Sequence, residues 1–89
     1  MSDQDMNYFD YLNLAKQKYK IILDKHPEIE GLSARELEVF EQLLSAKSLQ
    51  EIANELFITY SSVHFHCKNV YRKLGVANRK EILIKYKDI

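Results

Sequence analysis

The chain has 89 residues, with 13 Lys or Arg against 13 Asp or Glu and a formal net charge of zero. This length supports one hydrophobic core rather than two. No apolar run approaches the roughly eighteen residues that span a bilayer, and the N-terminal stretch MSDQDMNYFD is acidic, unlike a signal peptide. Cys67 is the only cysteine, so an intrachain disulfide is excluded. The composition therefore predicts a soluble, cytoplasmic protein with no membrane contact.

Positive charge is concentrated in the C-terminal third of the chain. Residues 60–89 contain seven Lys or Arg against Glu81 and Asp88, whereas residues 1–30 contain four Lys against six Asp or Glu. The distribution of charge matters more than its sum when a partner is anionic. Neutral net charge therefore does not exclude nucleic acid.

Apolar residues near the N-terminus recur at three- and four-residue spacing, as in an amphipathic helix. They predict a helix over residues 4–25 and are Tyr8, Tyr11, Leu12, Ala15, Tyr19 and Ile22. His26 precedes Pro27, which disfavours helix at His26 and ends the segment. Residues 1–30 are accordingly interpreted as an N-terminal helix and a short linker, and residues 31–89 as the main domain. The extra helix either packs on that domain, forms a dimer surface or docks a regulator.

Four helix starts follow Gly31. Ser33 with Glu36, Ser48 with Glu51 and Asn78 with Glu81 have the spacing of a capping box or its Asn variant. Thr59 is the expected N-cap of a helix over residues 60–74, which Gly75 ends in the left-handed conformation. The other three helices have expected apolar faces at Leu37, Phe40, Leu43 and Leu44, at Ile52, Ala53 and Leu56, and at Ile82, Leu83 and Tyr86.

The two middle helices are joined by residues 57–59 alone, which is the geometry of a helix-turn-helix. On the second of them, one stripe is expected to face the core and consists of Val63, Cys67, Val70 and Leu74. The opposite side presents Ser61, His64, Phe65, Lys68 and Arg72. A phenylalanine among polar residues on the side away from the core indicates a surface that contacts a large partner.

Two histidines and a cysteine in the run HFHCK raise the alternatives of a metal site and of catalysis. His64 and His66 lie about 200° apart around a helix, so they cannot bind one ion, and His64 with Cys67 supplies two ligands where structural zinc needs four. No acid within a turn orients either histidine as a base. The sequence thus predicts no metal, no cofactor and no enzyme, with His66 as a packed, hydrogen-bonded residue at the core border.

The stretches LSARELEVFEQLL and EIANELFITYSSVHFHCKNVYRKLGVANRKE resemble the LuxR-type (LuxR/FixJ) helix-turn-helix domain of bacterial transcription regulators. The resemblance runs from Gly31 to about Lys87 without a gap. It implies an all-α, tetrahelical DNA-binding domain, here preceded by one extra helix, whose recognition helix spans residues 60–74. It also implies a homodimer formed through the last helix on an imperfect inverted repeat. The N-terminal helix, which lies outside the resemblance, is a second candidate dimer surface.

Residue roles follow from the resemblance and from the chemistry of DNA together. Lys68 and His64 are expected to contact base edges or phosphate, and Phe65 a thymine methyl. Phosphate contacts are expected from Ser61, Ser62 and the helix start, and further along the helix from Arg72 and Lys73. Double-stranded DNA is the expected partner, and RNA polymerase is a further candidate.

Three positions depart from the family pattern. Ala46 replaces the usual Gly before the second helix, so this loop must avoid a positive φ angle or accept strain. Ser62 replaces Thr and keeps a hydroxyl, whereas His64 replaces a frequent Lys and removes a permanent charge. The alternative function is a protein-interaction module that retains the fold but binds DNA weakly or not at all.

Overall fold

The structure is a computed structural model that describes residues 20–89. Residues 20–25 are helical, followed by the 3-10 helix η1 (Pro27–Gly31) and by the α-helices α3 (Ala34–Leu43), α4 (Leu49–Leu56), α5 (Tyr60–Leu74) and α6 (Arg79–Lys85). The described part of the chain contains no strand. The helix that was predicted from residue 4 onward lies mostly outside the described residues, but its end before His26 is confirmed.

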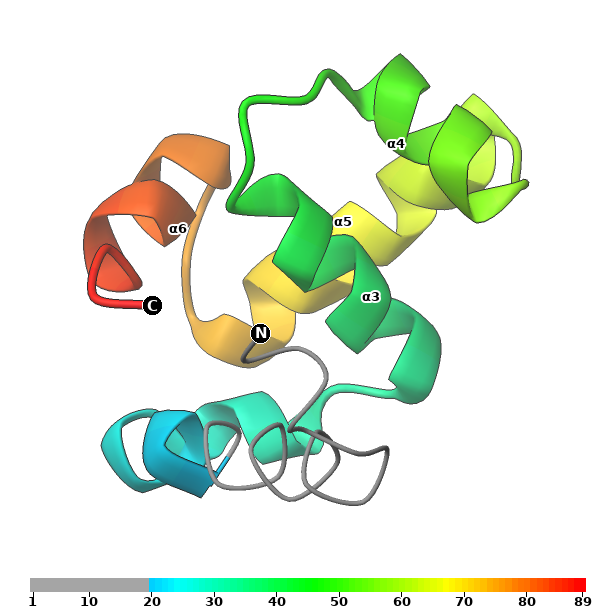
Figure 1. Ribbon diagram of the computed structural model, residues 1–89. Helices are drawn as coiled ribbons and strands as arrows, with labels where there is room; N and C mark the ends of the chain where they lie inside the picture. The colour runs from blue at the N-terminus through cyan, green and yellow to red at the C-terminus, as the bar shows by residue number, and fades with distance from the viewer. Residues whose placement is uncertain (1–19) are drawn as a thin grey trace, which may run out of the picture.

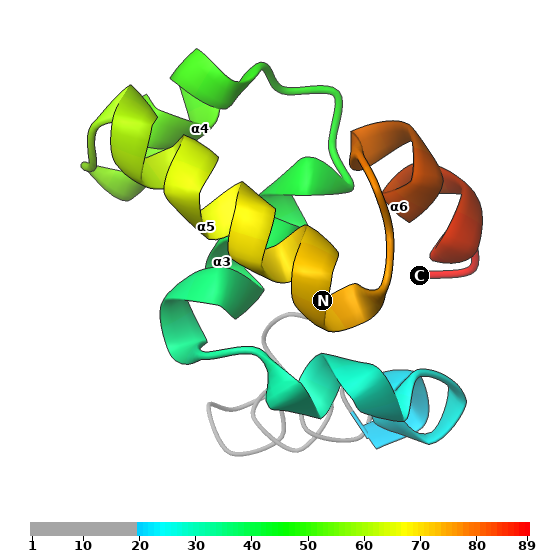
Figure 2. The same ribbon diagram turned by 180° about the vertical axis from the view of Figure 1, so that it is seen from behind.

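The longest helix, α5, organises the arrangement of the others. It packs against α3 and α4 and also contacts η1, while α6 packs against α3. In both views α4 lies at the end where α5 begins, and α6 lies beside the end where α5 stops (Figures 1 and 2). The first half of α5 therefore extends beyond α6 together with α4.

Local capping determines where the helices begin, as predicted. The capping boxes of Ser33 with Glu36 and of Ser48 with Glu51 are both complete. Thr59 accepts a hydrogen bond from the Ser62 N–H. At α6 the Asn78 side chain accepts from the Glu81 N–H, but the Glu81 carboxylate accepts from Ala77 N–H, one residue earlier than a capping box requires.

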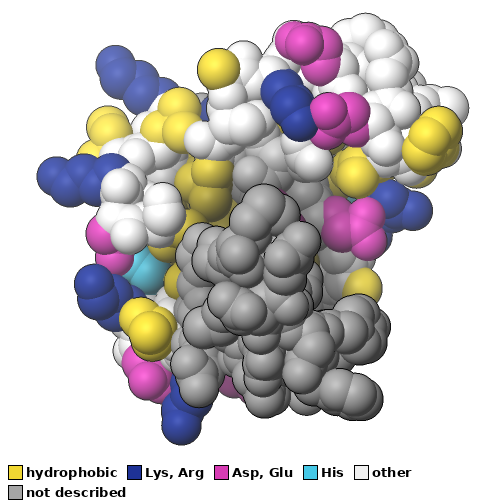
Figure 3. Space-filling view, viewed as in Figure 1, with side chains coloured by type: hydrophobic (Ala, Val, Ile, Leu, Met, Phe, Trp, Pro, Cys, Tyr) yellow, Lys and Arg dark blue, Asp and Glu magenta, His cyan; other side chains and the backbone are white. Residues whose placement is uncertain are grey.

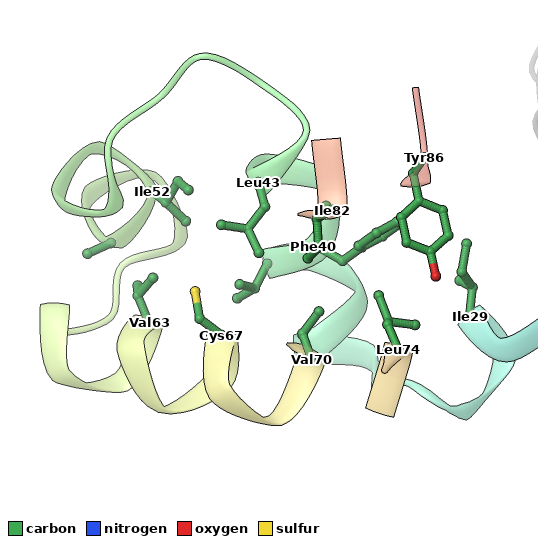
Figure 4. Packing of buried hydrophobic residues seen from close by; sticks show 12 residues of the cluster. Ile29, Phe40, Leu43, Ile52, Val63, Cys67, Val70, Leu74, Ile82 and Tyr86 are labelled. Atoms are coloured by element: carbon green, nitrogen blue, oxygen red, sulfur yellow. The ribbon is translucent and has the colours of Figure 1, made fainter. Parts of the chain in front are cut away.

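The predicted core stripe of α5 is confirmed. Its four side chains are at most 2% exposed and project to one side, toward α3, α4 and α6 (Figure 4): Val63, Cys67, Val70 and Leu74. Ile52, Ile82 and Tyr86 are buried as expected. The expectation that Leu83 lies on the core side of α6 is wrong, because Leu83 is 43% exposed.

The segment before α3 contributes to the core rather than only connecting two elements. Ile29 of η1 is 1% exposed and belongs to the buried cluster. The Tyr86 hydroxyl donates to the Glu28 carboxylate at 2.8 Å, and His26 lies 3.0 Å from Asp88. Residues 26–31, interpreted from sequence as a linker, thus join the main domain.

The loop between α3 and α4 contains Ala46, where the family pattern usually has Gly. Phe57 is the only non-glycine residue with a positive φ among those described, so Ala46 avoids the left-handed region. Arg79 binds the start of this loop, with its guanidinium donating to the carbonyls of Leu43 at 3.0 Å and Ser45 at 2.7 Å. An arginine from α6 therefore satisfies carbonyls that the end of α3 leaves free.

A buried carboxylate ties α5 to α3. Glu36 is 6% exposed, and its Oε1 accepts from the Ser33 N–H at 2.8 Å and from the Lys73 ammonium at 2.7 Å. Desolvation raises the pKa of this carboxyl, but the hydrogen bonds from Lys73 and Ser33 outweigh it and hold the pKa below its ordinary value. The charged form is therefore the one that the folded state favours.

Replacing Glu36 tests this tether. A depressed folded-state pKa stabilises the fold above the unfolded pKa, near 4.5, and that stability is lost as the pH falls through the folded value. Glu36→Gln should lower the free energy of unfolding at pH 7 by about 1.5–3 kcal/mol and weaken its acid dependence below about pH 5. Urea unfolding across pH 3–7 measures both. The control is Glu38→Gln, whose exposed pair with Arg35 should matter by less than about 1 kcal/mol.

Phe57 occupies a position that suits glycine. It ends α4 with φ 56° and ψ 42°, and its side chain is 94% exposed. Phe57→Gly relieves a left-handed conformation that costs about 1–2 kcal/mol, and it adds about 0.5–1 kcal/mol of chain entropy in the unfolded state. Thermal unfolding should therefore show unchanged or slightly higher stability.

The matched control is Gly75→Ala, since Gly75 has φ 70° and open space around its Cα. That substitution should destabilise the protein by about 1 kcal/mol. A loss of stability in Phe57→Gly larger than in Gly75→Ala would show that the Phe57 ring packs in a way that its exposure does not reveal.

Candidate nucleic-acid interface

The side of α5 opposite the core forms an exposed ridge of the predicted residues. Phe65 is 62% exposed, so it is not a core residue. The other exposed members are Ser61, His64, Lys68 and Arg72. Because the stripe on the other side is buried, the rotation of α5 about its own axis is set, and the ridge points away from the domain.

The start of α5 has the features of an anion-binding helix terminus. Its first turn contains no acidic residue. Thr59 caps the helix, and the hydroxyl of Thr59 also donates to the Ser62 hydroxyl at 3.0 Å. Ser62 is half-buried and Ser61 is exposed. The free N–H groups of the first turn and the helix dipole together favour a phosphate oxygen at this end.

The cations of α5 fall into two groups. Lys68 forms no ion pair within residues 20–89, and Arg72 donates to the neutral Asn69 side chain at 3.2 Å. Both keep a positive charge available at the surface. Lys73 differs, since its ammonium lies 2.7 Å from the Glu36 carboxylate. The structure thus groups Lys68 and Arg72 with the ridge and places the charge of Lys73 against α3.

Two exposed aromatic residues near this end were not identified from the sequence. Tyr60 is 50% exposed, and its ring stacks on the His64 ring with centroids 6.4 Å apart and an interplanar angle of 24°. Phe57 precedes the turn and is 94% exposed. Tyr60 lies four residues before His64, so helical spacing alone places it on the ridge. Phe57 has no comparable signal in the sequence, because it follows the end of α4.

His66 and Cys67 lie beneath the ridge, as predicted, but one expectation requires correction. Burial raises the pKa of the Cys67 thiol, and desolvation raises the pKa of the neighbouring Tyr71 to about 12. Both groups are therefore neutral at pH 7, in keeping with a structural role. The expected hydrogen bond of His66 is not observed for Nδ1, which is buried without a partner among the described residues.

Within residues 20–89, no group of three or more His, Cys, Asp or Glu side chains is placed to hold a metal ion. In the same range, no helix has both the length and the apolar character needed to cross a membrane. Chemically, the ridge offers hydrogen-bond donors, aromatic rings and two cations that form no ion pair with any described residue. These groups suit the phosphates and base edges of a duplex.

Comparison with known proteins agrees with this geometry. Residues 30–86 match the family model described as "Bacterial regulatory proteins, luxR family". The chain is 45% identical over 53 residues to the spore germination protein GerE of Bacillus subtilis (strain 168), with 60% of this chain and 72% of GerE covered. It is 37% identical over 71 residues to the HTH-type transcriptional regulator MalT of Yersinia pestis (strain Pestoides F), with 70% of this chain covered.

The chain spans only 8% of the length of MalT. No solved structure gives a significant match. The family model begins at residue 30 and ends at Tyr86, so it contains all four helices α3 to α6 and the complete ridge. The chain belongs to the LuxR family of bacterial regulatory proteins.

Proposed function

We propose that this protein is a sequence-specific transcription regulator that binds double-stranded DNA with α5 in the major groove. The observation that supports this most is the division of α5 into a buried stripe and an exposed ridge, on which Lys68 and Arg72 form no ion pair within residues 20–89. A helix that is free along one side fits the width of the major groove. The family description and the relative MalT, an HTH-type transcriptional regulator, support the same class of function.

Each ridge residue has a role that suits its position. His64 and Lys68 contact base edges or phosphate, and Phe65 contacts a thymine methyl. Ser61 and Ser62 bind a phosphate at the start of α5, and Arg72 binds a second one further along. Lys73 is a further phosphate contact of this proposal, and its ammonium also pairs with the Glu36 carboxylate.

Dimerisation through α6 completes the proposal. Leu83 is 43% and Ile84 60% exposed, and Ile84 lines a shallow open depression together with Val76, Glu81 and Lys85. Apolar side chains lie exposed between Lys and Arg side chains along the edge that α6 occupies (Figure 3). A second copy that covers this apolar surface adds burial to a small core.

A dimer related by a two-fold axis would place two copies of α5 in successive major grooves, about 34 Å apart, on an imperfect inverted repeat. Cytoplasmic location with nucleoid association, and contact with RNA polymerase, are parts of the proposal that follow from this role.

Lys68→Ala tests the DNA contact. Lys68 is an exposed cation of the ridge, so its removal should weaken operator binding. If its target is a phosphate, the slope of log K against log salt concentration should also become shallower by about one unit. Fluorescence anisotropy with a labelled duplex, selected from a random pool, at several salt concentrations measures both quantities.

The matched control is Lys87→Ala, which removes an equal charge from an exposed position beyond α6. It should leave the slope unchanged. Equal effects of the two substitutions would show that Lys68 does not contact DNA. A wild-type protein with no salt-dependent binding to any duplex would instead favour the protein-interaction module.

Ile84→Asp tests the dimer surface. A carboxylate in the apolar patch of α6 should convert the dimer to a monomer and lower operator affinity, without loss of thermal stability in the monomer. Sedimentation velocity measures the oligomeric state. The control is Ile21→Asp in the helical segment 20–25, because Ile21 is also 60% exposed. Dissociation by Ile21→Asp alone would contradict an α6 interface and assign the dimer to the N-terminal helix.

A further inference from the structure

We infer that Tyr60 is a positioning residue that holds the His64 imidazole for base recognition, and that it thereby determines part of the DNA specificity. The inference rests on the proposed function, since it requires that α5 enters the groove. It adds Tyr60, which neither the sequence motifs nor the family match singles out as a contact.

The geometry of the two rings is the first observation. Tyr60 and His64 are one helical turn apart, and their rings are close to parallel, with an interplanar angle of 24° and centroids 6.4 Å apart. The two ring planes are nearly parallel and laterally offset, and within residues 20–89 no hydrogen bond engages the edge of the imidazole that carries both ring nitrogens. A donor or acceptor on that edge can pair with N7 or O6 of a purine or with O4 of thymine.

The fold does not account for the Tyr60 side chain. It is 50% exposed, and it forms no side-chain hydrogen bond within residues 20–89. The start of α5 is already capped by Thr59, and the core stripe begins at Val63. Half of the Tyr60 surface is therefore open, and the aromatic contact found for its ring is the one with His64.

His64 has no other group to orient it in the described part of the chain. No hydrogen bond or ion pair to its ring is found there, and Tyr60 is the aromatic side chain that contacts it. Without the phenol ring, the imidazole would sample several rotamers, and ordering it on DNA would cost entropy. Tyr60 reduces this cost before binding, which raises discrimination at the base that His64 contacts.

The test measures base discrimination rather than affinity alone. A duplex is first selected from a random pool with the wild-type protein, and each half-site position is then varied to find the base pair whose preference is lost in His64→Ala. At that position Tyr60→Leu should reduce discrimination about threefold to tenfold, which is part of what one good base contact provides. Tyr60→Phe retains the ring and should keep the wild-type preference.

A double-mutant cycle separates positioning from independent contact. In the His64→Ala background, Tyr60→Leu should have no further effect on discrimination at that base pair. Phe57→Leu, which also removes an exposed ring beside the turn, should leave it unchanged in the wild-type background. Thermal unfolding of each variant verifies that the exposed substitutions leave the domain folded.

Three results would overturn the inference while leaving DNA binding intact. In the first, Tyr60→Leu reduces base preference equally with and without His64. In the second, Tyr60→Phe loses as much preference as Tyr60→Leu. In the third, His64→Ala loses no preference at any base pair. A wild-type protein that selects no sequence and binds no duplex would overturn the proposed function itself, and the role of Tyr60 with it.

Discussion

The packing of one stripe of α5 against α3 and α4 is the interaction on which the rest of this structure depends. Val63, Cys67, Val70 and Leu74 are buried almost completely, and together they determine which side of the helix is left free. A rotation that exposed this stripe would lose about 1.5–3 kcal/mol for each large apolar side chain. The rotation of α5 is therefore strongly determined, and the ridge on its other side has a defined orientation before any partner binds.

Some cations of the C-terminal third stabilise the fold, and others lie exposed at the surface. Lys73 pairs with buried Glu36, and Arg79 donates to the carbonyls of Leu43 and Ser45, so these two cations hold α5 and α6 on α3. Lys68 and Arg72 remain on the ridge. A chain with zero net charge can therefore still bind DNA, because two cations on the exposed side of α5 are available to phosphates. The excess of carboxylates lies in residues 1–30.

The two ends of the described chain meet around Tyr86. Desolvation raises the pKa of the Glu28 carboxyl, yet hydrogen bonds from its own backbone and from Tyr86, with the charges of Lys85 and His26, hold it below its ordinary value. The hydrogen bond with His26 similarly lowers the pKa of Asp88. Residues 26–29 are thus attached to the end of α6, which is also the helix proposed to form the dimer. Residues 26–29 and the proposed dimer surface are consequently parts of one packed unit.

Local spacing along the chain was enough to predict where α3 to α6 begin, the family and the division of α5 into two sides. Caps at Ser33, Ser48, Thr59 and Asn78, and the left-handed stop at Gly75, act within four residues along the chain, so spacing is sufficient to identify them. By contrast, the packing of the helices against one another makes Ile29 a core residue, leaves Leu83 exposed and brings Lys73 to Glu36. The last of these contacts joins residues 37 positions apart, and no local pattern encodes which helix faces meet.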